Sequence, residues 1–259
     1  MNASRRIFLI SATGAALNAS QAITVRRRDE AGARDTAAEL VPKKSAIILC
    51  DMWDKHWCRG ANERLAPIVE KARPLLDVAR RKGVVIIHAP SDTMEFYRDA
   101  PQRKAAQSTP RTIPPAMLAI DAPPLPIDDA GGGCDTGEKS YKAWTRQHAG
   151  IPVELQDYVT DKGGEVYSIL KVRGIETLFI MGVHTNMCIL NRTFAIRQMT
   201  RWGVKCVLIR DLTDAMYNPA DRPYVTHEQG TQLVIEHIER YWCASVESAD
   251  LMAALSGKA

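Results

Sequence analysis

The sequence predicts an α/β fold with three layers, in which a doubly wound parallel sheet lies between two layers of helices. Short apolar runs alternate with longer amphipathic segments along most of the 259 residues, a pattern typical of parallel strands joined by helices. Polar residues directly follow several of the apolar runs, as is usual where the carboxyl ends of strands form a ligand-binding edge. With 46% hydrophobic and 25% charged residues, the chain is suited to one large domain.

The expected elements follow from these runs in chain order. The apolar runs predict strands at 45–50, 84–88, 158–160, 177–181 and 205–209. The amphipathic segments predict helices at 62–82, 164–173, 189–202 and 227–241. Gly83, Gly174 and Gly203 come directly after the first three helices and are expected to end them. Pro74 predicts a kink or an interruption in the first helix.

Residues 92–153 do not continue the alternation of strands and helices. They are rich in proline and contain the run Gly131-Gly132-Gly133. A connection of this length without regular structure is uncommon in a compact domain and is frequently functional. We therefore expect a long Pro/Gly-rich excursion that covers or builds a site.

Residues 1–22 have the features of an export signal. Arg5 and Arg6 precede an apolar or small stretch at 7–17, and small residues lead to a possible cleavage point after Ala22. Two arginines in this position resemble a twin-arginine signal. The pattern predicts an exported or periplasmic protein, whereas a chance match would leave the protein in the cytoplasm.

The segment after this signal is polar and charged over residues 23–42. We expect it to be a flexible lead-in, since few apolar residues are available to hold it against a core. The folded domain is then expected at 43–259.

Composition excludes several kinds of partner. The net charge of +4 is modest, and no basic stripe is interleaved with aromatic residues, so nucleic-acid binding is not expected. Apart from the short apolar stretch near the start, no uncharged run approaches the length of a membrane span, so no membrane association of the mature form is expected. The cysteines lie far apart without a C-x-x-C or zinc-ligand spacing, and no disulfide pairing can be deduced. They are Cys50, Cys58, Cys134, Cys188, Cys206 and Cys243.

Cys188 is the most informative of these residues. It lies at the end of the run Gly182-Val183-His184-Thr185-Asn186-Met187-Cys188, between an expected strand and an expected helix. The free N–H groups at the start of a helix favour a thiolate and lower the pKa of a thiol. Cys188 is therefore a candidate nucleophile. The alternative is a buried structural cysteine, which is the more common fate of this residue type.

A cysteine nucleophile needs a base that takes its proton and a cation that holds the thiolate or orients the base. Other strand ends offer both kinds of group, because Asp51, His88 and the pair Asp161-Lys162 each follow an apolar run. In a parallel sheet these ends gather on one edge. Asp51 is the candidate base, and Lys162 is the candidate cation.

These residues resemble the motifs of the isochorismatase-like cysteine hydrolases, which include nicotinamidases and N-carbamoyl amide hydrolases. The similarity lies in the run 47–53 with Asp51, and in the run 182–188 with Cys188, and it extends over about residues 45–215. The resemblance implies an isochorismatase-like, Rossmann-like sheet and a catalytic triad of Cys188, Asp51 and Lys162. The chain departs from the family after Lys162, where an aromatic-rich stretch is missing. Lys139 and Lys142 are the alternative cations.

The resemblance also implies a mechanism. Cys188 attacks the carbonyl carbon of a small amide, ureido or related compound, Asp51 takes the thiol proton and passes it to the leaving amine, and water hydrolyses the thioester. The oxyanion is held by the N–H groups of His184 and Cys188, beside a cis peptide bond between Val183 and His184. The alternative is a noncatalytic small-molecule-binding protein on the same fold. Family members commonly associate, so a homo-oligomer is expected.

Several other side chains are candidates for the substrate pocket, although simple packing would also account for each of them. They are Trp53, His56, Trp57, Trp144 and Arg192. Nicotinamidases of this family bind a metal through a D-x-H pattern after the second strand, and that pattern is absent there. Asp54-Lys55-His56 has the same spacing in a different place. No metal and no cofactor is predicted.

Overall fold

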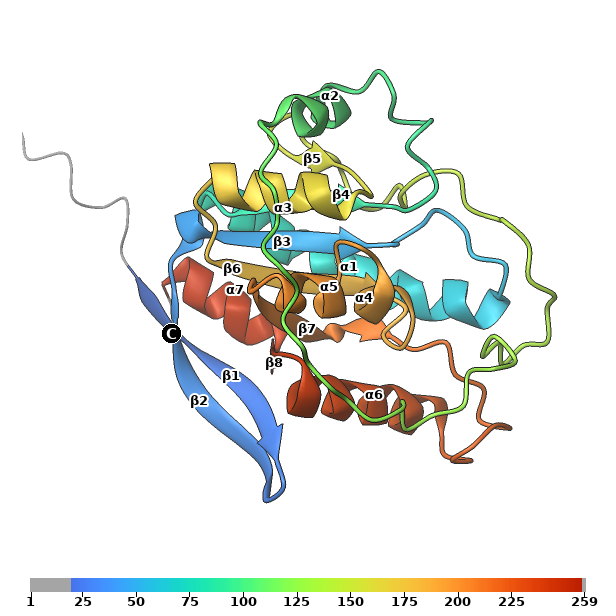
Figure 1. The fold of residues 1–259 in the computed structure, drawn as a ribbon. Coiled ribbons are helices and arrows are strands. Elements are labelled where there is room, and N and C mark those ends of the chain that lie inside the picture. The colour runs from blue at the N-terminus through green and yellow to red at the C-terminus, as the bar shows by residue number, and fades with distance from the viewer. Residues whose placement is uncertain (1–19, 258–259) are drawn as a thin grey trace, which may run out of the picture.

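The computed structural model describes residues 20–257, and its centre is one eight-stranded sheet in the order β2-β1-β8-β7-β6-β3-β4-β5 (Figure 1). Neighbours from β8 to β5 pair in parallel, and β1 pairs antiparallel with both β2 and β8. The predicted α/β class with a mostly parallel, doubly wound sheet is confirmed. The strands are β1 (Gln21–Asp29), β2 (Gly32–Leu40), β3 (Ser45–Cys50), β4 (Val85–Ala89), β5 (Tyr158–Val159), β6 (Thr177–Val183), β7 (Lys205–Asp214) and β8 (Ala244–Val246).

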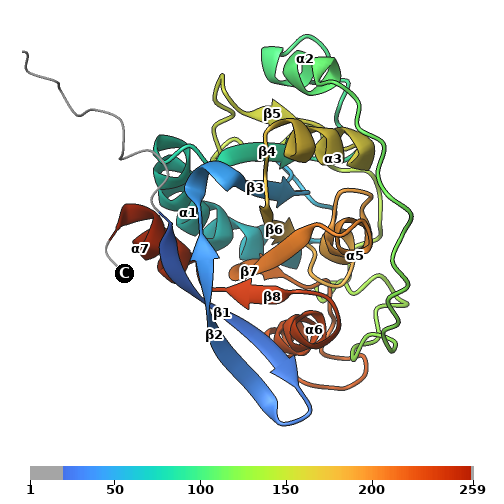
Figure 2. The same cartoon turned by 60° about the vertical axis from the view of Figure 1, so that its left-hand side comes forward.

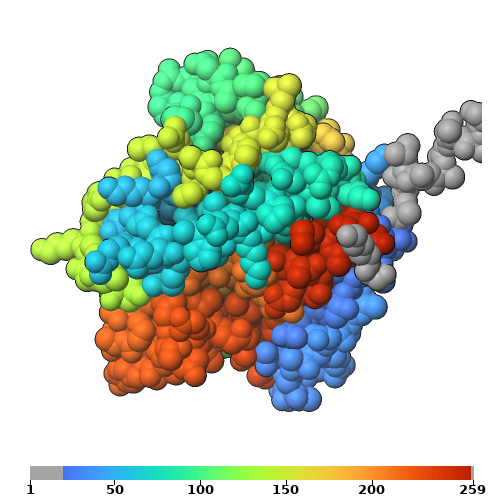
Figure 3. Space-filling model, turned by 180° about the vertical axis from the view of Figure 1, so that it is seen from behind, coloured from blue at the N-terminus to red at the C-terminus, as the bar shows by residue number. Residues whose placement is uncertain are grey.

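Helices cover both faces of the sheet. One face carries α1 (Arg59–Arg81) and α7 (Ser248–Ser256), whose apolar residues form one buried cluster with the strands (Figure 3). The opposite face carries α3 (Gly163–Val172), α4 (Cys188–Asn191), α5 (Ile196–Arg201) and α6 (His227–Tyr241), which share a second cluster (Figure 2). A short helix, α2 (Pro101–Ser108), lies beyond the β5 edge. None of the helices in residues 20–257 is long and apolar enough to cross a membrane.

Strand β3 shows why the central runs are continuously apolar. Successive side chains of a strand point to opposite faces. Ile47 and Leu49 join the cluster with α1, whereas Ala46, Ile48 and Cys50 join the cluster on the other face. Every residue of β3 is buried, as expected for a parallel strand that is covered on both sides.

The prediction of a flexible lead-in at 23–42 is wrong. This segment forms most of the β1–β2 hairpin, which extends the sheet at its antiparallel edge. Ile23 and Val25 alternate with polar residues along β1 and, with Leu40, are buried in the cluster of α1 and α7. Three inward apolar side chains are enough to anchor a half-buried edge hairpin, although charged outward residues dominate its composition.

The export-signal prediction falls on residues 1–22, of which 1–19 lie outside the described part of the chain. Gln21 and Ala22 are the first residues of β1. The cleavage point expected after Ala22 therefore lies inside this strand.

Two helix predictions need correction. Helix α1 begins at Arg59 and continues through Pro74. The single helix expected at 189–202 is two short helices, α4 and α5, because Arg192 has an extended backbone with φ −61° and ψ 151°. This break positions a side chain of the candidate site.

The excursion contains α2 and is otherwise mostly irregular between β4 and β5. It crosses the face that carries α3 and α5, where Thr112 N donates to Ser168 Oγ (3.0 Å) and Leu118 N donates to Arg201 O (2.8 Å). It then returns to the carboxyl edge of the sheet, where Thr145 N donates to Asp54 Oδ1 (2.9 Å) (Figure 1).

We predict that Ile23→Ala lowers the free energy of unfolding by about 2 kcal/mol, because it removes a buried side chain and leaves a cavity. The matched control is Thr24→Ala on the exposed side of the same strand, for which a change within about 0.5 kcal/mol is expected. Urea unfolding of the two variants measures the difference. Equal and small effects would contradict the docked hairpin.

Candidate active site

The candidate site lies where the carboxyl ends of three neighbouring strands meet. Cys50 at the end of β3 is in register with Ala89 of β4 and Gly182 of β6. The residues that follow these strands are therefore adjacent in space although they are distant in sequence. They include Asp51 after β3, Ser91 after β4, and the loop from His184 to Cys188 after β6.

Asp51 is completely buried and has a left-handed backbone with φ 49°, a conformation that aspartate tolerates better than most residues. Its Oδ1 accepts a hydrogen bond from Ser91 N (2.7 Å), and its Oδ2 accepts one from Arg192 Nε (2.8 Å). The thiol of Cys188 lies beside this carboxylate and lowers its pKa. Burial raises the pKa of Asp51, and the three neighbouring groups only partly oppose this shift. Asp51 is therefore a stronger base than an ordinary aspartate.

The expectation that the start of a helix lowers the pKa of Cys188 is wrong. Burial and the negative charge of Asp51 raise the pKa of this thiol above its ordinary value, and Arg192 and the N–H of His184 oppose this only in part. Helix α4 has only four residues, so its dipole is too short to outweigh a carboxylate in contact with the sulfur. The resting sulfur is therefore a protonated thiol next to Asp51.

The cation beside Asp51 is Arg192, not the predicted Lys162. The side chain of Lys162 is 63% exposed, and its Nζ lies 3.0 Å from Asp161 Oδ1. Of the two alternative lysines, Lys142 donates to Asp92 O (2.9 Å) and Lys139 is exposed. The sequence predicts Arg192 only as a pocket residue.

The break between α4 and α5 directs Arg192 to Asp51. Helix α3 begins against this break, where Gly163 N donates to Thr193 Oγ1 (3.0 Å). A Cβ atom at Gly163 would lie only 2.0 Å from the carbonyl oxygen of Thr193. Glycine at 163 therefore permits the close approach that accompanies the break.

The loop after β6 brings a backbone donor to the thiol. The peptide bond between Val183 and His184 is cis, as the resemblance implied. The N–H of His184 faces the sulfur of Cys188 and lowers the pKa of this thiol. Thr185 holds the loop in place, because its N–H donates to Asp214 O (2.9 Å) and its Oγ1 hydrogen-bonds with Thr213 Oγ1 (2.7 Å). A donor fixed in this way can serve a carbonyl oxygen that binds next to the sulfur.

The aromatic pocket candidates form one stacked group beside this loop. Trp53 stacks on Trp144 with ring centroids 4.1 Å apart, and Trp144 stacks on His56 at 5.9 Å. His56 meets His184 edge-on at 4.8 Å and packs against Trp57 at 5.1 Å. Trp144 belongs to the excursion, so this segment helps to build the wall.

Both histidines of this wall are uncharged at neutral pH. Burial lowers the pKa of His56 to about 4 and the pKa of His184 to about 3. The guanidinium of Arg192 lies at the other end of the group, 6.0 Å from the ring centre of Trp53. The wall is therefore aromatic and neutral at one end and cationic at the other.

A surface cleft of about 320 Å³ opens beside Arg192. Two basic and two acidic side chains contribute to it, so its lining is polar and mixed in charge. The lining residues are Ser91, Asp92, Asp161, Lys162, Asn191, Arg192 and Thr193. Lys162 thus lines the cleft, although its ion pair is with Asp161.

His88, another strand-end candidate, has a structural position. It is fully buried, and its ring nitrogens contact Gln147 Oε1 (2.9 Å) and Asp157 Oδ2 (3.0 Å). Gln147 belongs to the excursion, so this contact fastens the excursion to the sheet. No sequence signal distinguished this role from a role in the site.

Comparison with known proteins identifies the fold. No protein-family model and no curated protein sequence matches the chain. Among solved structures, a cysteine hydrolase from Pseudomonas syringae pv. phaseolicola 1448A is similar over 85% of this chain and 96% of its own, with 16% identity and a TM-score of 0.56. A protein assigned as an isochorismatase from Burkholderia xenovorans LB400 is similar over 83% and 88%, with 15% identity and a TM-score of 0.52. The chain has the isochorismatase-like fold that the sequence predicted.

The site geometry predicts that Asp51→Asn makes Cys188 easier to ionise. The substitution removes the negative charge that raises the pKa of Cys188 and leaves Arg192 to stabilise the thiolate. Alkylation of Cys188 by iodoacetamide, followed by peptide mass spectrometry, should be faster in Asp51→Asn than in the wild type at the same pH. Asp54→Asn is the control and should leave the rate unchanged. Slower alkylation of Asp51→Asn would contradict the arrangement.

Proposed function

We propose that this protein is a cysteine-dependent hydrolase of small amide, ureido or related carbonyl compounds. The observation that carries the proposal is the position of the completely buried Asp51 between the half-buried Cys188 thiol and Arg192, with the N–H of His184 directed at the same sulfur. It combines a nucleophile, a base of raised pKa, a fixed cation and an oxyanion donor within one contact shell. The fold shared with a solved cysteine hydrolase supports the assignment.

In the first half-reaction, the Cys188 sulfur forms a bond to the carbonyl carbon while its proton passes to Asp51. Because the resting thiol is protonated, proton transfer has to accompany the attack. The carbonyl oxygen takes up the electron pair of the C=O bond and accepts hydrogen bonds from the N–H groups of His184 and Cys188. The intermediate then re-forms the carbonyl, the C–N bond breaks, and the leaving nitrogen takes the proton from Asp51.

In the second half-reaction, water attacks the thioester on Cys188. Asp51 removes a proton from the water, and the tetrahedral intermediate expels the sulfur, which regains a proton from Asp51. Arg192 keeps Asp51 ionised between these steps, since a cation in contact with a buried carboxylate favours its charged form. It also fixes the direction in which the carboxylate faces the sulfur.

The surroundings support a small polar substrate. The cleft of about 320 Å³ beside Arg192 is of the size of a small-molecule site. Lys162 and Arg192 line this cleft and offer cationic donors. A small amide or ureido compound bearing a polar or anionic substituent matches these donors.

A noncatalytic binding protein on the same fold is the second candidate. Two observations favour it: the raised pKa of Cys188 and the ion pair that holds Lys162 to Asp161 instead of Asp51. This candidate predicts ligand binding without any covalent adduct on Cys188. The proposed hydrolase has to pass through such an adduct.

We predict that a panel of small amides, ureido compounds and activated esters yields at least one substrate that acylates Cys188. Intact-mass spectrometry after rapid acid quench should show the acyl adduct, and peptide mapping should place it on Cys188. Cys188→Ala should form no adduct and lose turnover while it keeps its unfolding midpoint. Full hydrolysis by Cys188→Ala would rule out thiol catalysis, and binding without an adduct in the wild type would favour the second candidate.

We predict that Arg192→Ala and Lys162→Ala have very different effects. Arg192→Ala should lower kcat/KM by on the order of 100-fold or more, because it removes the group that orients and ionises the base. Lys162→Ala should act mainly on KM, since Lys162 lines the cleft without a contact to Asp51. Steady-state kinetics of both variants test these roles. A larger loss of kcat in Lys162→Ala than in Arg192→Ala would contradict them.

The pH dependence follows from the pKa of Asp51. Burial raises this pKa above 3.8, and the ionised form is the active base, so activity is present above the raised pKa and is lost as the pH falls through it. Arg192 lowers the pKa of Asp51. Arg192→Gln should therefore move the acidic limb of the kcat/KM profile to higher pH. An unchanged limb would remove Asp51 from the mechanism.

A further inference from the structure

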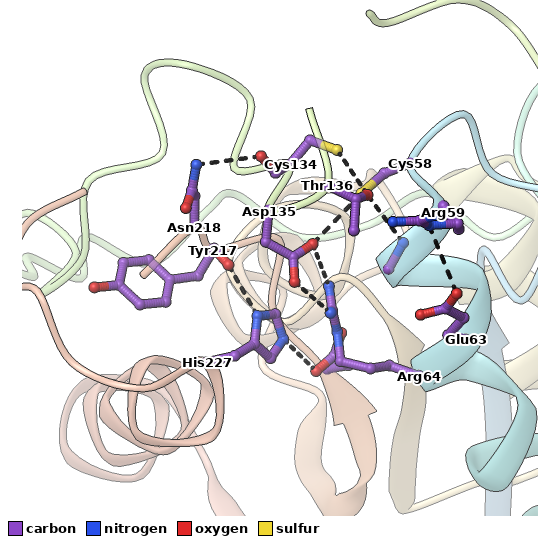
Figure 4. Close-up of polar contacts among 12 residues, drawn as sticks. Cys58, Arg59, Glu63, Arg64, Cys134, Asp135, Thr136, Tyr217, Asn218 and His227 are labelled. Atoms are coloured by element: carbon purple, nitrogen blue, oxygen red, sulfur yellow. Dashed lines mark hydrogen bonds and ion pairs between the residues drawn. The ribbon is translucent and has the colours of Figure 1, made fainter. Parts of the chain in front are cut away.

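A second cluster of reactive side chains lies outside the candidate active site, between the start of α1 and the excursion. Cys58 directly precedes α1, and Cys134 and Asp135 belong to the excursion. The two sulfur atoms and a carboxylate oxygen of Asp135 all lie within 4.8 Å of one another. Figure 4 shows the excursion side chains converging on Cys58 and the first turn of α1.

We propose that Cys58, Cys134 and Asp135 bind a thiophilic divalent cation such as Zn²⁺, which links the excursion to α1. The donor set of two sulfurs and one carboxylate oxygen is of the kind that tetrahedral zinc sites use. With metal–sulfur bonds of about 2.3 Å and metal–oxygen bonds of about 2.0 Å, neighbouring donors lie about 3.5–3.8 Å apart. Cys58 Sγ and Asp135 Oδ1 are 3.7 Å apart.

The two sulfur atoms of this cluster have different electrostatic surroundings. Partial burial raises the pKa of Cys134, but hydrogen bonds with Cys58 and Thr136, and from the N–H groups of Thr136 and Glu138, lower it below its ordinary value overall. Cys58 stands at the N-cap of a 23-residue helix whose first turn holds no acidic residue. Burial and the neighbouring Cys134 nevertheless raise the pKa of Cys58 above its ordinary value, so a bound cation would have to displace the proton of this thiol.

Asp135 is already held in the orientation of a ligand. Arg64 Nη1 contacts Asp135 Oδ2 (2.6 Å), Arg64 Nη2 contacts Oδ1 (3.2 Å), and Arg64 Nε contacts Asp214 Oδ2 (3.0 Å). Figure 4 shows Arg64 between Asp135 and His227, whose Nε2 lies 2.8 Å from Asp214 Oδ1. Carboxylates that bind metals are commonly fixed by such outer hydrogen bonds. Arg64 would orient Asp135 and offset part of the negative charge of the thiolates.

Gly60 gives independent support, because it makes room for the carboxylate. A Cβ atom at position 60 would lie 2.4 Å from Asp135 Oδ1 and 2.8 Å from Arg64 Nη1. The first-turn amide of Gly60 instead donates to Thr136 Oγ1 (3.2 Å), and that of Arg59 donates to Glu138 Oε2 (3.3 Å). Glu138 Oε2 is 3.4 Å from Cys134 Sγ, so Glu138 or water would complete four ligands.

The experiment is a cobalt titration of the reduced, chelator-treated full-length chain. Co²⁺ bound to thiolates gives a strong sulfur-to-metal charge-transfer band in the near ultraviolet and visible bands characteristic of tetrahedral geometry. We expect one equivalent of Co²⁺ to produce both, and one equivalent of Zn²⁺ to remove them. Cys58→Ser and Cys134→Ser should weaken binding by at least about 100-fold, since loss of an outer partner already costs about 10–100-fold.

Two further variants keep the test decisive if a cysteine variant does not fold. Asp135→Asn preserves the shape of the side chain but should weaken the cobalt affinity and alter the visible bands. Cys206→Ala, in the apolar core, is the matched control and should bind Co²⁺ as the wild type does. The proposal fails if the wild type shows no charge-transfer band, if Cys58→Ser and Cys134→Ser retain it, or if the reduced chain re-forms a Cys58–Cys134 disulfide and binds no metal.

Discussion

The ion pair between Asp51 and Arg192 is the contact on which the candidate site depends. A carboxylate that is completely removed from water is costly unless a cation and hydrogen-bond donors offset its burial. Arg192 and the N–H of Ser91 supply this compensation. Their geometry requires the left-handed backbone of Asp51 and the helix break at Arg192. Removing Arg192 would leave an uncompensated buried charge, which in other proteins costs about 3–5 kcal/mol.

Burial and the charge of Asp51 explain why the thiol rests in its protonated form. Burial raises the pKa of Cys188 most, and Asp51 repels a thiolate more strongly than Arg192 attracts it. This arrangement, a protonated thiol next to the candidate base, differs from sites that hold a free thiolate at the N-terminus of a long helix. In the proposed mechanism Asp51 therefore takes part in every chemical step, and Arg192 keeps it ionised.

The sequence predicted the features that rest on local pattern and missed those that rest on tertiary contact. Continuous apolar runs identified the parallel strands, and the segments after them contain Asp51 and Cys188, which the fold brings together. The helical pattern of 189–202 concealed the break at Arg192, because the break accompanies a contact with Gly163 from another part of the chain. The hairpin was missed because its inward residues are few, and Lys162 was preferred through a motif that the chain follows only in part.

The excursion connects these findings, since it contributes Trp144 to the aromatic wall and Gln147 to the contact with His88.

The most direct test of the central claim is the infrared difference spectrum between the wild type and Cys188→Ala in the S–H stretching region at neutral pH. The account predicts an S–H band displaced by a strong hydrogen bond, present in the wild type and shifted toward its free position in Asp51→Asn. A wild-type spectrum without this S–H band, accompanied by thiolate absorption in the ultraviolet, would contradict the claim.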